Sequence, residues 1–337
     1  MKIFMIGATG LLGSAGADEL IKRGHEVVGI SLPPIPKDSD INPEIKLSLG
    51  NYLELSDDEL RDYLRGCEGF VFAAGVDERV EFAPPCYDAY VKYNIQPVQR
   101  ILKIAQEEGV KKSVILGSYF SYFAKNYPEL KLYEKNPYIR SRIDQENAAF
   151  SYSNKGMEVM VLELPYIFGI QKGRKPVWTV ILEQILKMKK NTYYPGGGTT
   201  MVTVKQVAEC IAGAIEKGEG GTAYPVGYYN MTWVEFLKIV HKSIGMPERK
   251  VITIPKWLYK IFAKNIIKEY KEKNVEPGLD PYSLGDLMSM NLFIDRDIIQ
   301  EKLGATDDDI EKAIDDSFKL SMQVLKGEQE VIGMKAE

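Results

Sequence analysis

Apolar and polar positions come in alternating blocks along the first half of the chain. Short apolar runs typical of buried strands occur at residues 2–6, 25–30, 69–75, 110–117 and 157–165. Helix-like patterns separate them, for example where apolar residues recur on one face between residues 98 and 105. Strands that alternate with helices form a parallel sheet whose connections are helices. The pattern therefore predicts an α/β fold with a doubly wound parallel sheet over residues 1–169.

The pattern changes after Gly169. Helix-like stretches follow at residues 180–190 and 203–217, and a third begins at Thr232, which forms a capping box with Glu235. The segment 255–282 is rich in lysine and aromatic residues, so it either covers a substrate or forms a solvated pair of amphipathic helices. The predicted division is a first domain at 1–169 to which 199–218 returns, a smaller C-terminal α/β domain at 170–198 and 219–326, and a tail at 327–337.

Composition narrows the class of protein. The chain has 337 residues, enough for a large core and a second domain, and its net charge of −4 gives no basic surface for nucleic acid. No apolar run is long enough to span a bilayer, so we expect no membrane partner. The three cysteines lack metal-site spacing and are typical of a reduced, cytoplasmic protein. With only His25 and His241 present, we expect no metal site and no Ser-His-Asp triad.

The turn after the first strand carries the clearest chemical signal. Three glycines in the pattern G-x-x-G-x-x-G follow the strand at residues 2–6, and a helix-like pattern and a second strand come after them. Such a turn lets backbone N–H groups approach a pyrophosphate, and the dipole of the next helix favours its negative charge. The first domain is therefore predicted to be a Rossmann-type dinucleotide-binding domain, and the smaller domain to bind the substrate. The residues expected to hold the pyrophosphate are Gly7, Thr9, Gly10, Leu11, Leu12 and Gly13.

Further short motifs follow the glycine-rich turn. They are Ala73-Ala74-Gly75 at a strand end, Asn94 at a helix opening, the segment 137–142 followed by Glu146, and the segments 164–169 and 223–227. In order and spacing they resemble the extended short-chain dehydrogenase/reductase family, which contains nucleotide-sugar epimerases and dehydratases. The resemblance implies an NAD(P)-dependent oxidoreductase, epimerase or dehydratase that acts on a carbonyl or hydroxyl of a small molecule, such as a nucleotide-sugar. It also implies a homodimer formed through helices near residues 91–105 and 138–150.

The resemblance implies a catalytic tyrosine that acts as acid or base, with a lysine four residues later. Here the tyrosine is Tyr138, but Arg142 stands at the lysine position. A cation on the same helix face lowers the high pKa of a tyrosine, and an arginine keeps that charge although it cannot transfer a proton. A second pair with the same spacing, Tyr127 and Lys131, fits poorly because Pro128 lies between them.

The family also places a serine or threonine near the tyrosine, where it orients the substrate oxygen. The glycine at the end of the strand, Gly117, favours Ser118 for this role. An alignment on the next motif of the family instead puts Tyr119 at the serine position, with Ser121 two residues later. Ser118 is therefore the predicted catalytic serine, and Tyr119 and Ser121 remain open.

The resemblance also assigns the residues around the rest of the cofactor. They are Ser31, Asn51 and Tyr52 beside the adenosine, Ala73, Ala74, Gly75 and Asn94 in the middle, and Tyr138, Arg142, Pro165 and Tyr166 around the nicotinamide. Family members that prefer NAD carry an acid after the second strand, where it binds the ribose hydroxyls. This chain has Ser31 there, with Lys37 nearby, so nothing repels a 2′-phosphate and the sequence favours NADP over NAD.

Other departures from the family pattern leave two functions open. Glu163 replaces a common arginine, and Tyr166 stands where epimerases carry an asparagine. Cationic residues in the loops, which could hold the diphosphate of a substrate, are Arg79, Lys172, Arg174 and Lys175. The first hypothesis is the NAD(P)-dependent enzyme described above. The alternative is a catalytically inactive NAD(P)-binding sensor or scaffold. The sequence fixes neither the substrate nor the direction of reaction.

Overall fold

The computed structural model describes residues 1–36, 39–153 and 156–333, and its centre is a seven-stranded sheet. The strands follow the order β10-β6-β5-β4-β1-β2-β3, and every pairing among them is parallel. They are β1 (Lys2–Ile6), β2 (Glu26–Ser31), β3 (Lys46–Leu49), β4 (Gly69–Phe72), β5 (Lys112–Leu116), β6 (Glu158–Glu163) and β10 (Thr222–Pro225). The predicted Rossmann-type α/β fold is confirmed.

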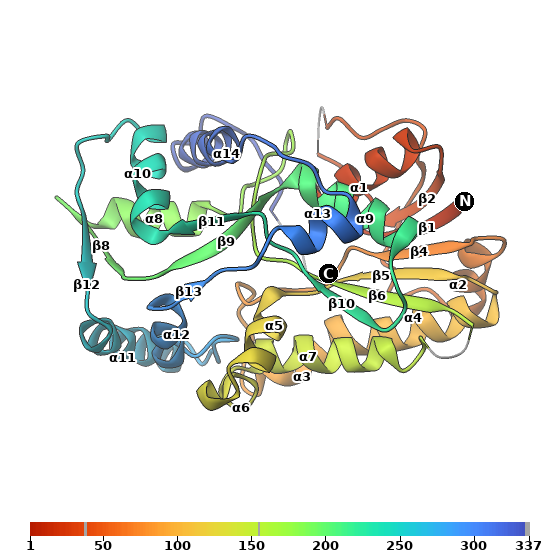
Figure 1. Cartoon of the computed structure of the whole chain (residues 1–337), viewed down its shortest axis with the longest axis horizontal. Helices are drawn as coiled ribbons and strands as arrows, with labels where there is room; N and C mark the ends of the chain where they lie inside the picture. The colour runs from red at the N-terminus through yellow and green to blue at the C-terminus, as the bar shows by residue number, and fades with distance from the viewer. Residues whose placement is uncertain (37–38, 154–155, 334–337) are drawn as a thin grey trace.

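Helices cover both faces of this sheet, as Figure 1 shows. On one face lie α1 (Leu11–Lys22), α9 (Val204–Lys217) and α13 (Asp297–Leu303), and on the other lie α2 (Asp57–Leu64), α4 (Gln96–Glu107) and α7 (Pro137–Phe150). The first group shares one apolar cluster with the sheet, and α2, α4 and α7 share a second. Burial of both sheet faces explains why the strands appear in the sequence as continuous apolar runs.

Two placements bear on the predicted division of the chain. Helix α9 packs against α1, so residues 204–217 lie on the central seven-stranded sheet. Strand β10 pairs with β6 at the edge of the same sheet, although its residues fall within the range 219–326 expected in the substrate-binding domain. A four-residue strand that forms the edge of a sheet has no long apolar pattern to reveal it in the sequence. The remaining domain boundaries stay a prediction.

The smaller part of the molecule is built on two short sheets. The first joins β7 (Tyr166–Phe168), β9 (Gly198–Thr203), β11 (Tyr229–Thr232) and β13 (Asn291–Leu292), and the second joins β8 (Thr192–Pro195) and β12 (Val251–Ile254). Its helices are α8 (Thr179–Lys187), α10 (Trp233–Ser243), α11 (Lys256–Glu272), α12 (Pro281–Met288) and α14 (Ile310–Leu325). An aromatic cluster forms its core, in which Phe168 stacks on Trp178 at 4.2 Å and Phe236 packs near Phe318.

Local signals in the sequence set several helix ends. The predicted capping box of Thr232 and Glu235 opens α10, and Thr203 forms a similar box with Gln206 at the start of α9. His241 is buried on α10, where its ring nitrogens contact Thr192 and the Arg249 carbonyl, so its role is structural.

Short helices connect the large elements near the middle of the molecule. They are α3 (Cys86–Tyr90), η1 (Val91–Ile95), α5 (Tyr119–Asn126), η2 (Pro128–Leu130) and α6 (Leu132–Lys135). Helices α4 and α7, in the region expected to form a dimer interface, pack against each other on one face of the sheet. The homodimer stays a prediction.

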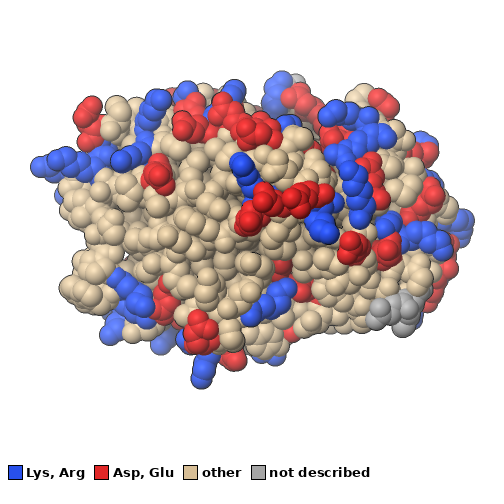
Figure 2. Space-filling view, in the orientation of Figure 1, with Lys and Arg blue, Asp and Glu red and all other residues tan. Residues whose placement is uncertain are grey.

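Surface charge, membrane-spanning helices and metal-binding groups complete the description. The face in Figure 2 mixes acidic and basic side chains. Of the helices within the described ranges, none is both long and apolar enough to cross a membrane. The same ranges contain no group of three or more His, Cys, Asp or Glu residues that could hold a metal ion.

Candidate dinucleotide and catalytic site

The glycine-rich turn is packed so closely that side chains are excluded from it. A Cβ on Gly7, where φ is +86°, would lie 2.3 Å from the Ala73 carbonyl oxygen. A Cβ on Gly13 would lie 2.0 Å from the Gly7 oxygen. At the N-cap of α1, Gly10 offers no side-chain cap, and the first turn of α1 contains no acidic residue. The helix therefore opens with N–H groups and a dipole that favour a bound anion, as expected for a dinucleotide diphosphate.

Two of the side chains predicted to contact the adenosine, Ser31 and Asn51, form hydrogen bonds within the protein. The Ser31 hydroxyl accepts a hydrogen bond of 3.0 Å from the backbone N–H of Thr9, so it stabilises the turn itself. Asn51 accepts from the Leu53 N–H and donates to Glu54. Ser31, at the end of β2, is thus joined to the glycine-rich turn, and Asn51, just after β3, lies in a local turn. Lys37, the expected partner of a 2′-phosphate, lies outside the described residues.

Tyr52 and the small residues of the Ala73-Ala74-Gly75 segment border the same edge of the sheet. Tyr52 is buried edge-on against Phe72, with ring centroids 5.8 Å apart, and burial raises its pKa well above the ordinary value for tyrosine. Ala73 donates to the Ile6 carbonyl and lies directly against Gly7. The strand ends of β1 and β4 thus meet at the turn, where a flat ligand could approach the backbone.

Asn94 holds the loop after β4. Its side chain accepts from the Val76 N–H and donates to the Val76 carbonyl, at 2.8 and 2.9 Å. A Cβ on Gly75 would lie 2.6 Å from the Asn94 side-chain oxygen, so only glycine fits there. The side chain of Asn94 is therefore engaged with the protein backbone in this structure, whereas the sequence predicted a cofactor contact.

A wide helical turn explains the position of Asn94. It lies in the π-helical segment η1, just before Pro97. Proline has no N–H, so the carbonyl four residues earlier cannot receive an α-helical bond, and the backbone widens there. Gln145 of α7 donates a 2.7 Å hydrogen bond to the Asn94 carbonyl and so satisfies part of the disturbed segment.

Tyr138 lies in the first turn of α7, a helix that begins at Pro137. Its side chain is 4% exposed, and the Ser118 side chain near it acts to lower its pKa. The guanidinium carbon of Arg142, one helical turn later, is 5.1 Å from the centre of the Tyr138 ring. The backbone N–H of Tyr138 donates to the Gly278 carbonyl, which ties the smaller part of the molecule to this helix. The structure therefore brings Tyr138, Arg142 and Ser118 together.

The net effect on the Tyr138 pKa differs from the expectation. Burial raises the pKa of Tyr138, and the Arg142 cation acts in the opposite direction, as predicted. The carboxylates of Glu78 and Asp77 raise it further, so the net pKa lies above the ordinary value for tyrosine. Asp77 and Glu78 belong to the loop after β4, and the sequence analysis did not associate either residue with Tyr138.

Arg142 is held by two partners and keeps one nitrogen without any. It donates through Nη1 to Gln145 and through Nη2 to the Val76 carbonyl, at 3.0 and 3.1 Å. Its Nε is buried without a hydrogen-bond partner among the described residues, and the side chain is 7% exposed. A buried donor without an acceptor is unfavourable, and a ligand hydroxyl would supply one. Gln145 lies three residues after Arg142, a spacing that could have revealed this helix pair in the sequence.

The other candidates for the serine position face elsewhere. The Tyr119 hydroxyl lies 3.2 Å from the Thr199 hydroxyl, and Ser121 is buried one turn further into α5. Tyr127 and Lys131 flank the short helix η2, so they do not share one helix face as a catalytic pair requires. Of these alternatives, Ser118 is the one whose side chain acts on the pKa of Tyr138 by lowering it.

Tyr166 and Pro165 connect the two parts of the molecule. The Tyr166 ring stacks on Trp178 at 5.5 Å and meets Tyr119 edge-on at 6.1 Å. Pro165 is half-buried in the link between β6 and β7. The position that carries an asparagine in epimerases is therefore part of an aromatic wall here, which joins the candidate site to the core of the smaller part.

Glu163, which stands where the family commonly has an arginine, belongs to a buried cluster of charged side chains. Glu163 is 1% exposed, and the Lys125 ammonium lies 2.9 Å from its carboxylate and 2.7 Å from that of Glu146. Lys125 comes from α5, so the positive charge reaches this place from a different element. Burial raises the pKa of Glu163 to about 7, although Lys125 acts to lower it.

The shifted pKa of Glu163 makes stability depend on pH. The folded protein holds a proton that the unfolded chain releases above pH ~4.3, so the stabilisation is complete at low pH and is lost as the pH rises through about 7. The linked change is roughly 3 kcal/mol. We expect Glu163→Gln to lose less thermal stability than the parent protein between pH 5 and pH 8, measured by circular dichroism. An exposed control, Glu134→Gln, should behave like the parent, and identical pH dependence in all three proteins would contradict the assignment.

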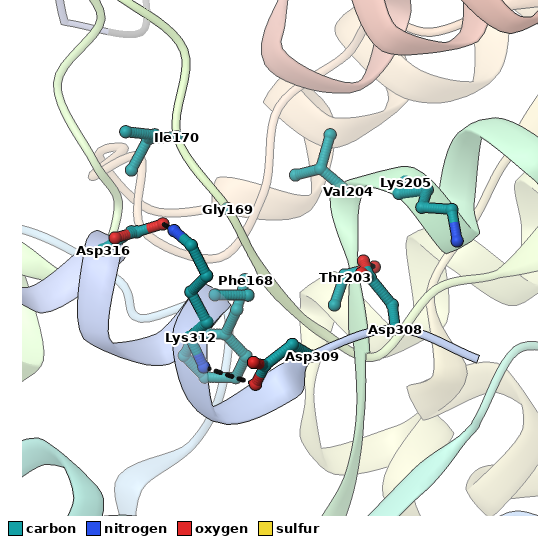
Figure 3. Close-up of a pocket in the computed structure, with 11 residues that line it drawn as sticks. Phe168, Gly169, Ile170, Thr203, Val204, Lys205, Asp308, Asp309, Lys312 and Asp316 are labelled. Carbon is teal, nitrogen blue, oxygen red and sulfur yellow. Dashed lines mark hydrogen bonds and ion pairs between the residues drawn. The ribbon is translucent and has the colours of Figure 1, made fainter.

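The cavity in Figure 3 is a separate feature. It measures about 220 Å³ and lies between the end of β7 and the starts of α9 and α14. Its polar groups pair with one another: Thr203 donates to Asp308, Asp309 caps the Lys312 N–H, and the Lys312 side chain pairs with Asp316. These contacts fix the junction of three elements and leave the catalytic candidates elsewhere.

Comparisons with known proteins agree with this arrangement. The Saccharomyces cerevisiae protein YLL056C is 27% identical over 266 residues, which are 76% of this chain and 83% of the yeast protein. The crystal structure of gox2253 has a TM-score of 0.71 at 22% identity and covers 96% of this chain and 98% of that one. A UDP-glucuronic acid 4-epimerase from Bacillus cereus, solved in complex with NAD, has a TM-score of 0.67 at 13% identity, with 96% and 99% covered.

The similarity to these two solved structures shows a shared fold. A sequence model described as the NAD dependent epimerase/dehydratase family matches residues 3–227, a range that runs from the first strand of the central sheet through β10. That range contains the glycine-rich turn and the group of Ser118, Tyr138 and Arg142. The chain belongs to the NAD-dependent epimerase/dehydratase family.

Proposed function

We propose that this protein is an NAD(P)-dependent enzyme that oxidises or reduces a hydroxyl or carbonyl carbon of a nucleotide-sugar. Tyr138 is the acid or base, Ser118 orients the substrate oxygen, and Arg142 supplies the cation in place of the usual lysine. The observation that carries the proposal is the position of Tyr138 between both partners, with the Arg142 guanidinium 5.1 Å from its ring and with Ser118 acting, like Arg142, to lower its pKa.

The residues present fit a nicotinamide dinucleotide. The turn leaves no room for a Cβ at Gly7 or Gly13, and the first turn of α1, which has neither a side-chain cap nor an acidic residue, presents its N–H groups to a diphosphate. The unpartnered Nε of Arg142 could donate to a ribose hydroxyl. The bound nicotinamide would supply the acceptor or donor of hydride. NADP remains favoured by the missing acid at Ser31, and NAD is the cofactor in the Bacillus cereus epimerase structure.

The proton chemistry falls to Tyr138. As a phenolate it would accept the proton of a substrate hydroxyl when the C–H bond breaks, and as a phenol it would return that proton in the reverse direction. Arg142 favours the phenolate but keeps its own proton. Ser118, whose side chain acts on the Tyr138 pKa, would fix the substrate oxygen between the two hydroxyls. A nucleotide-sugar is the proposed substrate class because the Bacillus cereus neighbour acts on UDP-glucuronic acid.

The test is a binding and turnover panel with the full-length protein. We expect NAD or NADP to bind by calorimetry, and at least one UDP- or dTDP-sugar to be converted, detected by chromatography of the products. Tight dinucleotide binding without conversion across the panel would reject catalysis and favour the sensor or scaffold. A protein that binds neither dinucleotide would overturn both functions.

A further inference from the structure

The loop after β7 reaches across the molecule to the glycine-rich turn. Gln171 donates through Nε2 to the Thr9 carbonyl and the Ser14 hydroxyl, both at 3.1 Å. Arg174 donates through Nη2 to the same Thr9 carbonyl at 2.9 Å, and its Nε donates to Gln171. Thr9 lies within the predicted diphosphate turn. The loop thus places a guanidinium beside the backbone that would hold the cofactor.

The charge of Arg174 is unbalanced in this position. Among the described residues no carboxylate pairs with Arg174, and its hydrogen bonds there come from Nε and Nη2, so Nη1 is left without an acceptor. Burial lowers the pKa of Arg174, the direction expected for a cation that has lost water without gaining an anion. The first turn of α1, on the other side of the turn, is also free of acidic residues. Two sources of positive potential therefore converge on Thr9 and Gly10.

A segment near the C-terminus also holds this loop through backbone hydrogen bonds. The Lys175 N–H donates to the Ile332 carbonyl at 3.0 Å, and the Ile332 N–H donates to the Gly173 carbonyl at 2.9 Å. Residues around Ile332, which the sequence predicted to be a frayed tail, thus form a short parallel bridge to the loop. The bridge fixes the backbone on both sides of Arg174. An arginine on a fixed loop loses less conformational entropy when it binds an anion.

We propose that Arg174 binds a phosphate group of the dinucleotide, either its diphosphate or the 2′-phosphate of NADP. This inference rests on the proposed function, and it extends that function to a loop of the smaller part of the molecule. The planar guanidinium suits phosphate oxygens, and the free Nη1 leaves a donor for them. The sequence analysis considered Arg174 for the diphosphate of a substrate, whereas the contacts with Thr9 put it on the cofactor side of the site.

The test compares dinucleotide affinities of three variants by calorimetry. Arg174→Met should raise the Kd for at least one of NAD and NADP by roughly 10- to 100-fold, because a hydrogen-bonded ion pair is lost. Arg174→Lys should recover part of the affinity. Lys172→Met removes an exposed charge from the same loop and should change the Kd less than about 2-fold. An equal loss for NAD and NADP assigns the diphosphate, and a loss confined to NADP assigns the 2′-phosphate.

Two results separate the possible failures. If Arg174→Met binds both dinucleotides as the parent does, the inference is overturned and the proposed function stands. If the parent binds neither dinucleotide, the proposed function itself fails. A melting temperature close to that of the parent, measured without ligand, would establish that Arg174→Met is folded. If Arg174→Met is unfolded, Arg174→Lys is compared with the parent by the salt dependence of the dinucleotide Kd. A steeper dependence in Arg174→Lys supports the inference, since salt screens a more exposed lysine–phosphate pair more strongly, and the same Kd and salt dependence in both proteins overturns it.

Discussion

Replacing Tyr138 with phenylalanine is expected to lower kcat by roughly 10²- to 10⁴-fold, the usual contribution of a positioned general acid or base. The change removes one hydroxyl and keeps the ring against Arg142, so dinucleotide affinity should change little. Turnover of the nucleotide-sugar found in the panel measures the loss, and calorimetry measures cofactor binding. Full turnover in Tyr138→Phe would exclude Tyr138 as the acid or base.

The matched control is Tyr127→Phe. Tyr127 belongs to the second tyrosine–lysine pair of the sequence, but it lies at the end of α5 beside the short helix η2. We expect this variant to keep parental kcat. Loss of activity in Tyr127→Phe with retention in Tyr138→Phe would move the chemistry to the Tyr127 pair and reverse the assignment.

The direction in which the pH profile of activity shifts distinguishes a catalytic role of Tyr138 from a structural one. Because burial and the carboxylates of Glu78 and Asp77 raise the Tyr138 pKa, oxidation by the phenolate should increase with pH toward an alkaline limb. Arg142 lowers this pKa, so Arg142→Met should move the limb to higher pH. Glu78→Gln should move it to lower pH. A defect that only loosened the fold would lower activity without moving the limb in opposite directions.

Replacing Gly13 with alanine should abolish measurable dinucleotide binding. The added Cβ would lie 2.0 Å from the Gly7 oxygen and 2.8 Å from its carbonyl carbon, and neither backbone atom can move without opening the turn. We expect the Kd to rise more than ~100-fold, since the turn is proposed to supply most of the diphosphate contacts. The protein should also lose about 1–3 kcal/mol of stability from overpacking.

The control for Gly13 lies at the other end of the same helix. Gly24 has a φ of +85° and open space around its Cβ position, and asparagine tolerates that conformation. Gly24→Asn should therefore bind NAD or NADP as the parent does. If Gly13→Ala also binds with parental Kd, the diphosphate does not occupy this turn and the cofactor assignment is wrong.

Local patterns predicted the features whose causes are local. The apolar runs, the capping box at Thr232 and the glycine-rich turn each depend on residues close together in sequence, so they survive in any tertiary setting. The helix pair of Tyr138 and Arg142 follows in the same way from a spacing of four. These features were sufficient to predict the parallel sheet, and they place the candidate site at the carboxyl ends of its strands as a prediction.

Other assignments depended on contacts between distant segments. The sequence left Ser118, Tyr119 and Ser121 open because one residue of rotation at the start of α5 changes which side chain meets Tyr138. The contact of the Asn94 side chain with the backbone of Val76 was not predicted, because a backbone partner has no signature in a side-chain pattern. Backbone partners are invisible to residue identity.

By itself the sequence determined a dinucleotide-binding α/β fold with a tyrosine and an arginine on one helix, because backbone geometry and periodicity act over a few residues. Only the tertiary structure decided that Lys125 supplies the charge missing at Glu163, and that Arg174 rests on Thr9, 165 positions away. Charge and hydrogen bonding act through space at a few ångströms, so the partner is chosen by how the chain folds and not by its order.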